Sequence, residues 1–454
     1  MFATVNPATG ETLAEYPSLS GTDLRTILTR ADAAWESWRT TSFGERAALI
    51  RKVGALLRDR TTEYARLMAL EMGKPIASGR SEAEKCATAC DYYAEHAETF
   101  LADEIVATDA SRSYVHYEPL GAVLAIMPWN FPFWQVIRFA APTLMAGNVA
   151  LLKHAANVPG CAGALEQLFL DAGFPRGVFQ NLYVEHDLVG RIIRHRAVHA
   201  ITLTGSTRAG RDVAKQAGAR LKKTVLELGG SDPYVILDDA DLDLAVETCV
   251  SSRLINTGQS CIAAKRFVVV EKVREEFTAQ FVERMRAVTM GDPLDERNSI
   301  GPLARRDLRD TLHDQVERSI AKGASLLLGG KRPDGPGAFY PPTVLANVAK
   351  GMAAYTEELF GPVASIIPAR NERAAIRIAN DSVFGLGAAV FTRDLDRGER
   401  IAARELRAGS CFVNAFVKSD ARLPFGGIKE SGYGRELSQH GIREFVNVKT
   451  VYVK

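Results

Sequence analysis

From about residue 112 onward, short apolar runs alternate with helical stretches, and this alternation limits the fold more than any other feature of the sequence. The apolar runs predict buried strands over residues 122–127, 149–153, 178–182 and 199–204. The intervening stretches predict helices over residues 159–172 and 209–216. Strands that alternate with helices at this spacing are typical of a parallel, doubly wound sheet.

A second series of the same kind follows Gly229. Its predicted strands cover residues 233–237, 267–270, 325–328, 365–368, 388–391 and 411–414. Its predicted helices cover residues 242–255, 274–288 and 372–380. A single hydrophobic core stops growing at roughly 250–300 residues. The 454 residues therefore favour two domains, with the pair Gly229–Gly230 as the hinge between them.

The two ends of the chain have patterns of their own. The first hundred residues are largely helical in pattern, whereas the tail 444–454 alternates apolar and polar residues like an exposed strand. A lone strand has an unsatisfied edge, so we expect it to pair with another element or another subunit. The predicted class is α/β, with two doubly wound (Rossmann-like) domains plus a small β oligomerisation unit.

The composition excludes several classes of protein. With 56 Lys plus Arg against 54 Asp plus Glu, the net charge is +2, which gives no reason to expect nucleic acid or an anionic membrane as a partner. The six cysteines are too sparse for a disulfide scaffold. The N-terminus lacks the basic and apolar regions of a secretory signal, so we expect a cytoplasmic protein.

One uncharged stretch is long enough to span a membrane. Between Glu118 and Arg138 lie 19 residues without charge. Pro128 and Pro132 interrupt helical hydrogen bonding within it, and lipid offers no partners for the freed backbone groups. The sequence therefore predicts a buried strand that ends at a proline-rich loop.

Two pairs of potential metal ligands have helical spacing. His195 and His199 are four residues apart, as are Cys86 and Cys90. Neither pair has nearby residues that complete a ligand set, so we predict no metal site.

Three residues could carry chemistry, and each has a plainer interpretation. Cys261, in NTGQSCIAAKR, is either a small buried hydrophobe or a thiolate nucleophile. Glu227, in TVLELGGSDP, is either a surface charge or a carboxylate kept in a site. Asn130, in MPWNFP, either forms an Asx turn or aims its amide at an oxyanion.

The segment TLTGSTRAG places Gly205, Ser206 and Gly210 after a predicted strand and at the start of a predicted helix. It matches neither the dinucleotide fingerprint G-x-G-x-x-G nor the P-loop. Backbone N–H groups at a helix N-terminus nevertheless form a natural anion site.

Taken together, these segments resemble the aldehyde dehydrogenase superfamily over essentially the whole chain. The matching pieces are NPATGE (6–11), PWNFP (128–132), LLK (151–153), GFPRGVFQ (173–180), TGS (204–206), LELGGSDP (226–233), GQSC (258–261), EELFGPV (357–363), FVN (412–414) and PFGGIKESGYGRE (424–436). The resemblance implies a cofactor-binding domain of residues 1–102 and 119–228, a catalytic domain of 229–436, and oligomerisation strands in 103–118 and 437–454.

The resemblance also assigns roles to residues. It implies Cys261 as nucleophile, Glu227 as general base and Asn130 as oxyanion donor. For the cofactor it implies Lys153 on the adenosine ribose, Ser206 on the pyrophosphate, and Glu358 with Phe360 at the nicotinamide ribose. The further cofactor contacts that it implies are Trp129, Ala156, Gly205, Gly210 and Leu228.

Arg138 bears on the substrate. It lies eight residues after Asn130, where many family members have an aromatic tunnel residue, and a guanidinium there would pair with a substrate carboxylate. With Phe131 and Ser419 as further substrate contacts, the chain resembles the succinate-semialdehyde dehydrogenases, particularly the short bacterial form. This implies oxidation of succinic semialdehyde to succinate through a cysteine thiohemiacetal and thioester.

Two alternatives remain open at this point. Arg138 could pair with an internal carboxylate instead. The enzyme would then be a broad dehydrogenase of small or aliphatic aldehydes. From another class, Cys261 and Glu227 could serve a thioesterase or amidase without a redox cofactor.

The choice of cofactor rests on Ala156. NAD-selective relatives often carry Glu at this position, three residues after Lys153, where it binds the ribose hydroxyls and repels a 2′-phosphate. Ala156 removes that repulsion, and Lys153 and His154 could supply positive charge. We therefore expect NAD or NADP, with NADP favoured. The terminal strand and the segment ATDASRSYVHYEP indicate a homodimer or homotetramer.

Overall fold

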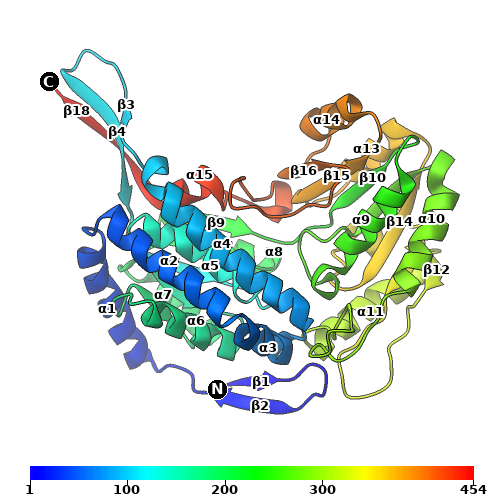
Figure 1. The fold of residues 1–454 in the computed structure, drawn as a ribbon, viewed down its shortest axis with the longest axis horizontal. Coiled ribbons are helices and arrows are strands. Elements are labelled where there is room, and N and C mark those ends of the chain that lie inside the picture. The colour runs from blue at the N-terminus through cyan, green and yellow to red at the C-terminus, as the bar shows by residue number, and fades with distance from the viewer.

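The computed structural model describes residues 1–454 and arranges them as two α/β lobes with a projecting three-stranded arm (Figure 1). The predicted α/β class is confirmed. No helix is both long and apolar enough to cross a bilayer.

The first lobe contains a six-stranded sheet in the order β17-β9-β8-β5-β6-β7. Its strands are β5 (Ala122–Ile126), β6 (Val149–Lys153), β7 (Phe179–Asn181), β8 (Val198–Thr204), β9 (Lys223–Glu227) and β17 (Gly432–Tyr433). All pair in parallel except β17. The chain runs from β5 to β7 on one side of β5 and continues with β8 on the other. Such a reversal opens a crevice at the carboxyl ends of the strands, where ligands bind in doubly wound folds.

Helices cover both faces of this sheet (Figure 1). They are α1 (Gly21–Trp38), α2 (Phe43–Asp59), α3 (Thr61–Met72), α4 (Ile76–Phe100), α5 (Trp134–Met145), α6 (Pro159–Asp171), α7 (His186–Arg194) and α8 (Thr207–Gly218). The uncharged stretch forms β5, a proline-rich loop and the start of α5. Every residue of α5 is buried, so its apolar character serves the protein core.

The second lobe contains a seven-stranded sheet in the order β12-β13-β14-β11-β10-β15-β16. Its strands are β10 (Pro233–Ile236), β11 (Arg266–Val270), β12 (Ser325–Leu328), β13 (Thr343–Ala346), β14 (Val363–Ala369), β15 (Gly387–Phe391) and β16 (Ser410–Val413). Its helices are α9 (Leu242–Leu254), α10 (Glu271–Arg286), α11 (Arg306–Ala321), α12 (Ala353–Thr356), α13 (Glu372–Asn380) and α14 (Leu395–Arg404). Only β12 runs antiparallel to its neighbour.

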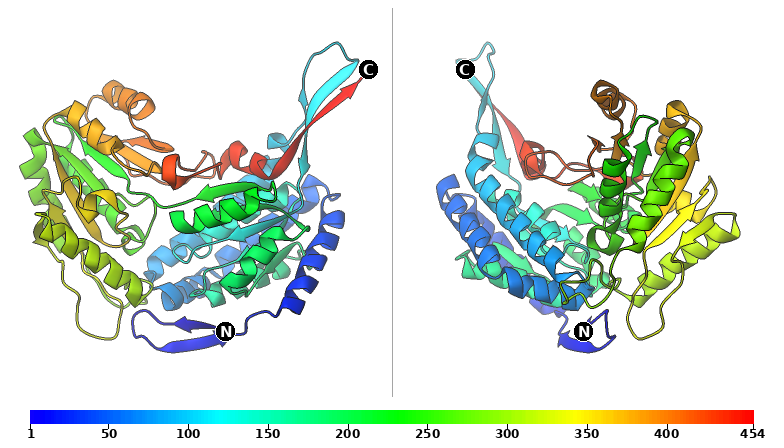
Figure 2. Two further views of the ribbon diagram at one scale, coloured as in Figure 1. Left: turned by 180° about the vertical axis from the view of Figure 1, so that it is seen from behind. Right: turned by 45° about the vertical axis from the view of Figure 1, so that its right-hand side comes forward.

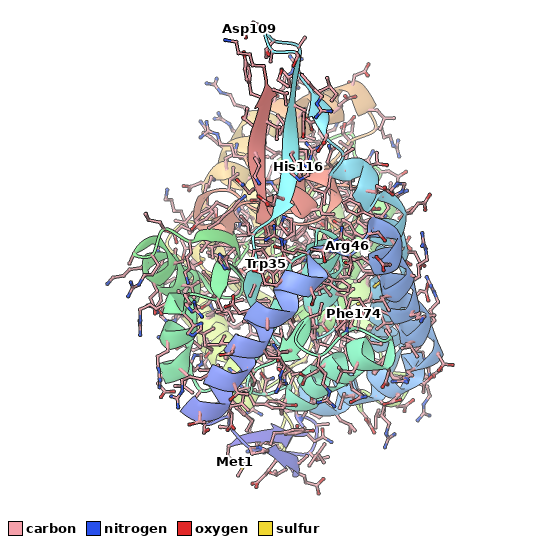
Figure 3. All side chains as sticks on the ribbon, turned by 90° about the vertical axis from the view of Figure 1, so that its left-hand side faces the viewer. Met1, Trp35, Arg46, Asp109, His116 and Phe174 are labelled. Carbon is pink, nitrogen blue, oxygen red and sulfur yellow. The ribbon has the colours of Figure 1, made fainter.

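The arm consists of β3 (Glu104–Ile105), β4 (Arg112–Pro119) and β18 (Val446–Val453), and it extends away from both lobes (Figure 2). The terminal strand β18 pairs antiparallel with β4 along its whole length. Asp109, in the turn before β4, lies at the tip of the arm (Figure 3). The other edge of β18 has no partner within the chain, and Val448 and Tyr452 on this strand are exposed.

The predicted domain ranges remain predictions, but two details differ from the expected layout. The strand β17 lies before residue 436 and yet joins the first sheet by pairing with β9. In addition, the N-terminus forms an antiparallel hairpin of β1 (Phe2–Val5) and β2 (Thr12–Tyr16). The short helix α15 (Ser438–Ile442) then leads into β18.

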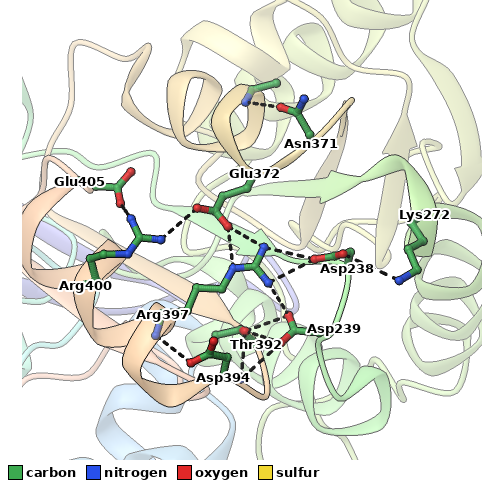
Figure 4. A network of polar contacts seen from close by, with 11 residues as sticks. Asp238, Asp239, Lys272, Asn371, Glu372, Thr392, Asp394, Arg397, Arg400 and Glu405 are labelled. Atoms are coloured by element: carbon green, nitrogen blue, oxygen red, sulfur yellow. Dashed lines mark hydrogen bonds and ion pairs between the residues drawn. The ribbon is translucent and has the colours of Figure 1, made fainter.

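An ion-pair network joins three elements of the second lobe (Figure 4). Arg397, in α14, contacts the Glu372 carboxylate at 2.6 Å, Asp239 at 3.1 Å and Asp238 at 3.2 Å. Glu372 opens α13, and the two aspartates follow β10. One guanidinium therefore holds three carboxylates together in a partly buried position.

We expect Arg397→Met to destabilise the second lobe, because it leaves three neighbouring carboxylates without that cation. Partial exposure limits the loss in free energy of unfolding to about 1–2 kcal/mol, or roughly 2–6 °C in melting temperature. Thermal unfolding measures it. Arg393→Met is the matched control, because Arg393 is exposed and lies 3.8 Å from Asp241. Equal melting temperatures for the two variants would contradict a structural role for the network.

Candidate active site

Cys261 follows the distorted turn Ile255–Gly258 and lines a cavity of about 220 Å³ between the two lobes. The other residues that line this cavity are Pro128, Trp129, Asn130, Gln135, Thr204, Gly205, Ser206, Leu228, Gly229, Leu308, Glu358 and Phe360. The cavity lies at the carboxyl ends of β5, β8 and β9, as expected for a doubly wound sheet.

The loop that carries Cys261 is held by a buried lysine. The Lys265 amine donates hydrogen bonds to the carbonyl oxygens of Ser260 and Cys261, each at 2.9 Å, and of Ala263 at 3.1 Å. It also lies 3.6 Å from the Glu358 carboxylate. Lys265 is not among the predicted site residues, although a lysine between CIAA and RFVVV is an unusual charge in an apolar run.

The turn before Cys261 has a strained backbone. Asn256 and Thr257 have φ angles of 53° and 57°, and for a β-branched residue such as threonine this is an outlier. The Asn256 amide donates to the carbonyl oxygens of Asn130 at 2.7 Å and Gln259 at 3.1 Å. The strain thus accompanies hydrogen bonds that connect the Cys261 loop to the Asn130 loop.

Asn130 is buried at the end of β5, and its Nδ2 donates to the Gln259 carbonyl at 3.0 Å. The same nitrogen carries a second hydrogen that can be donated elsewhere. The backbone N–H of Cys261 has no acceptor within the protein. Two donors therefore border the cavity beside the thiol, which is the arrangement that stabilises an oxyanion.

A buried ion pair fixes the start of α5 and the loop before it. Glu82, in α4, accepts hydrogen bonds from the backbone N–H groups of Phe133 and Trp134, each at 2.9 Å. Its other oxygen pairs with Lys74, whose amine lies 3.9 Å from the centre of the Phe131 ring. These contacts orient the residues that directly follow Asn130.

The Cys261 thiol does not ionise easily by itself. Burial raises the pKa of Cys261 to about 12, although the nearby Lys265 and Arg138 cations oppose the rise. The thiolate needed for nucleophilic attack must therefore be generated by a neighbouring base.

Glu227 ends β9 and is buried without a hydrogen-bond donor for either carboxylate oxygen. Burial raises the pKa of Glu227 well above its ordinary value, and the nearby Glu436 carboxylate raises it further. Its side chain does not line the Cys261 cavity. It faces Gly426, where an added Cβ would lie 2.7 Å from Oε1. Glu227 is therefore a buried carboxyl group with a raised pKa, and its side chain is turned away from the Cys261 thiol.

The three predicted substrate contacts do not line this cavity. Arg138 is buried in α5, pairs with Glu436 and lies 4.8 Å from the centre of the Phe425 ring. This is the internal pairing that the sequence left open, and nothing in the sequence near Arg138 indicated its partner. Ser419 is also buried and accepts a hydrogen bond from Lys85, while Phe131 lies beneath Lys74.

A second cavity, of about 910 Å³, shares Pro128, Trp129, Thr204 and Gly205 with the first. It extends along Lys153, Ala155, Ala156, Asn157, Glu185, His186 and Arg305. The Lys153 amine makes no hydrogen bond or ion pair within the chain, and Ser206 caps the N-terminus of α8 at this end of the sheet. An unpartnered lysine and a helix N-terminus fit a dinucleotide with its ribose hydroxyls and phosphates.

Glu358 and Phe360 line the Cys261 cavity from the side of the second lobe. Glu358 is held by the backbone N–H of Gly230 at 3.0 Å, and burial raises the pKa of its carboxyl group. The Phe360 ring packs edge-on against Trp129, with ring centres 5.7 Å apart. Both side chains border the cavity of Cys261.

Two expectations about the cofactor groove need revision. His154 does not supply positive charge, because burial lowers its pKa to about 4. Its ring nitrogens lie 3.3 Å from the Met127 carbonyl and 3.0 Å from the Pro132 carbonyl, so it braces the proline-rich loop. Gly210 lines neither cavity. A Cβ at this position would lie 2.6 Å from Leu228, so the glycine permits close packing.

Comparison with known proteins places this site in a family. Residues 1–451 match the description "Aldehyde dehydrogenase family". The chain is 50% identical to the succinate semialdehyde dehydrogenase [NAD(P)+] Sad of Escherichia coli (strain K12), over 99% of this chain and 97% of that one. It is 49% identical to a probable succinate-semialdehyde dehydrogenase [NADP(+)] of Synechocystis, over 99% of both chains.

A solved structure gives the same result. The succinic semialdehyde dehydrogenase from Streptococcus pyogenes, in complex with NADP+, superposes with a TM-score of 0.98 at 38% identity and covers 100% of both chains. Fold, sequence and the arrangement around Cys261 agree, and the chain belongs to the aldehyde dehydrogenase family.

Proposed function

We propose that the protein oxidises succinic semialdehyde to succinate with NADP or NAD, and that NADP is favoured. The observation that carries the proposal is the junction of the Cys261 cavity with a groove that contains the unpartnered Lys153 and the small Ala156. The relatives named above support the choice of substrate and cofactor.

The reaction begins at the Cys261 sulfur. The thiolate attacks the aldehyde carbon, and the carbonyl oxygen becomes an oxyanion that accepts hydrogen bonds from the Asn130 amide and the Cys261 backbone N–H. When bound, the nicotinamide ring supplies the hydride acceptor. Oxidation leaves a thioester on Cys261, and attack by water releases the carboxylate product and restores the thiol.

Glu227 serves as the base in this proposal. Its raised pKa suits a carboxyl group that takes a proton from the thiol or from the attacking water and later returns it to solvent. Both tasks require the side chain to turn from Gly426 toward Cys261 by rotation about its own side-chain bonds. The absence of hydrogen bonds to its carboxylate oxygens leaves it free to do so.

A matrix of kcat/KM values tests the proposal directly. Succinic semialdehyde and propanal are each assayed with NADP and NAD, following reduced cofactor by absorbance. We expect the highest kcat/KM for succinic semialdehyde with NADP. Equal values for both aldehydes would indicate a broad dehydrogenase, and product formation without cofactor reduction would indicate a thioesterase or amidase.

We expect Ala156→Glu to weaken use of NADP while sparing NAD. The new carboxylate would face the 2′-phosphate across the groove beside Lys153, and a like charge there costs at least about 1.4 kcal/mol, or tenfold in KM for NADP. Ala156→Gln is the matched control, with the same length and no charge. A similar rise in KM for NADP in both variants would assign the effect to bulk and contradict the charge argument.

We further propose that the protein is a cytoplasmic homodimer or homotetramer. The unpaired edge of β18 on the projecting arm supports association, since an edge strand is a template for pairing with another chain. All six cysteines are free, which suits a reducing compartment. Light scattering measures the mass, and a monomeric mass would contradict the association.

A further inference from the structure

Three carbonyl groups of the loop that carries Cys261 converge on one buried amine. Lys265 donates hydrogen bonds to the carbonyl oxygens of Ser260, Cys261 and Ala263, which matches the three hydrogens of an ammonium group. The Lys265 side chain is only 1% exposed and does not line the Cys261 cavity. The carbonyl oxygens of this loop therefore point into the protein interior.

The geometry of the peptide group converts this arrangement into a direction for the Cys261 N–H. The Ser260 carbonyl and the Cys261 N–H belong to one planar trans peptide group, so their C=O and N–H bonds point in opposite directions. A hydrogen bond that holds the Ser260 carbonyl toward Lys265 therefore holds the Cys261 N–H away from Lys265. That N–H has no acceptor within the protein, and Cys261 lines the cavity.

A buried carboxylate and a close glycine hold the amine and the loop together. Glu358 lies 3.6 Å from the Lys265 amine and accepts a hydrogen bond from the backbone N–H of Gly230 at 3.0 Å. Burial lowers the pKa of Lys265, and the Glu358 carboxylate opposes this shift as a buried counter-ion. A Cβ at Gly230 would lie 2.7 Å from the Cys261 carbonyl oxygen, so the glycine permits the loop to pack this closely.

We propose that Lys265 is a positioning residue for the backbone half of the oxyanion site, and that it acts through the Ser260 carbonyl on the Cys261 N–H. The proposal rests on the proposed function, in which that N–H and the Asn130 amide donate to the same oxyanion. Donation by an ammonium to the Ser260 carbonyl also polarises the peptide group and strengthens its N–H as a donor. Lys265 thus sets both the direction and the strength of one of the two donors.

Loss of Lys265 has a second effect that the test must separate from the first. Burial raises the pKa of Cys261 and the Lys265 cation opposes the rise, so removal of Lys265 also lowers the fraction of thiolate. Two reagents distinguish the effects. The thiolate attacks the carbonyl carbon of p-nitrophenyl acetate, forms a C–S bond and an oxyanion, and then expels p-nitrophenolate. With iodoacetamide it forms a C–S bond at a saturated carbon and expels iodide, so no oxyanion develops.

The measured quantity is the rate of acylation divided by the rate of alkylation at one pH, because the fraction of thiolate cancels in this ratio. Absorbance of p-nitrophenolate in the first turnover measures acylation, and mass spectrometry of the Cys261 peptide measures alkylation. In Lys265→Met we expect the ratio to fall at least tenfold, since loss of one oxyanion donor lowers a rate by about 10²–10³-fold. An unchanged ratio would overturn the proposal, because a purely structural or electrostatic role slows both reactions alike.

Lys222→Met is the matched control. Lys222 also donates to two backbone carbonyl oxygens, those of Ile193 and His195, each at 2.6 Å, but it does not line the Cys261 cavity. We expect its removal to leave the ratio at the wild-type value. A fall as large as that in Lys265→Met would contradict a specific role for Lys265.

Asn130→Ala separates this proposal from the proposed function. It removes the side-chain donor to the same oxyanion, so we expect it to lower the ratio as well. Neither reagent needs cofactor or aldehyde, so the outcome does not depend on which aldehyde is the substrate. A ratio that falls in Asn130→Ala and not in Lys265→Met refutes the role of Lys265 alone. A ratio that falls in neither variant refutes the oxyanion site of the proposed function as well.

A double variant covers the case in which Lys265→Met does not fold. Removal of Lys265 leaves the buried Glu358 carboxylate without its cation, and an unpaired buried charge destabilises a protein. Lys265→Met combined with Glu358→Gln removes both members of the ion pair together, and the two reagents report on Cys261 without cofactor. We expect the ratio to fall at least tenfold here too. A folded double variant with the wild-type ratio would refute the proposal.

Discussion

Glu227→Gln is expected to release one equivalent of reduced cofactor in a rapid burst and then almost stop. Glutamine matches glutamate in size but cannot take a proton from water, so the thioester on Cys261 should accumulate. General-base catalysis contributes about 10²–10⁴-fold, and we expect steady turnover to fall by this amount. Stopped-flow absorbance measures the burst, and mass spectrometry of the quenched protein measures the acyl group on Cys261.

The same experiment separates the two tasks proposed for Glu227. If the carboxyl group is also needed to deprotonate the thiol, the burst itself will slow, because burial raises the pKa of Cys261 to about 12. A burst that slows more at pH 7 than at pH 9 would identify that second task. If the burst and the steady turnover fall equally at every pH, Glu227 does not act as the base in deacylation.

Cys261→Ala provides the reference for complete loss, since it removes the atom that forms the covalent bond. We expect neither burst nor turnover. Cys411→Ala is the matched control, because Cys411 is also only partly buried but lies in β16, outside the cavity. It should retain both the burst and the steady rate.

Much of the fold could be predicted from local patterns. Continuous apolar runs gave β6 at 149–153 and β12 at 325–328 with the observed bounds, and most other strands were within one or two residues. The strands β9, β13 and β17 and the pair β1–β2 were not anticipated. They are short, and β13 lies in the segment YPPTVLANV, where the prolines and the asparagine conceal a four-residue strand.

The reacting residues could be proposed from motifs, but their environment could not. The sequence around Arg138 contains no acid, and its partner Glu436 arrives from the other end of the chain. The same holds for Lys85 and Ser419, and for Glu82, which binds the backbone at the start of α5. Such contacts depend on how distant elements meet, whereas sequence patterns report on neighbours along the chain.

The ionisation state of a side chain was the second property that the sequence alone did not predict correctly. A histidine beside a lysine was expected to add positive charge to the cofactor groove. The fold instead buries His154 between backbone carbonyl groups, which leaves it neutral near pH 7. Burial decides the ionisation of a side chain, and burial is set by the tertiary structure.

Asn130→Ala should lower kcat by about 10²–10³-fold, the usual result of removing one donor from an oxyanion site. The backbone N–H of Cys261 remains, so some activity should persist. Because the oxyanion forms in the first chemical step, the burst should slow together with turnover, unlike the result expected for Glu227→Gln. Rapid-quench measurement of the burst rate distinguishes the two.

Asn130→Asp makes this prediction sharper. Aspartate has nearly the same shape as asparagine but places a carboxylate beside the developing oxyanion, so charge repulsion adds to the lost hydrogen bond. We expect a larger loss of kcat than in Asn130→Ala, provided that the melting temperatures of both variants stay near that of the wild-type protein. The amide also ties the β5 loop to Gln259. If both variants lose activity equally and also lose stability, Asn130 acts by holding that loop and not by donating to the substrate.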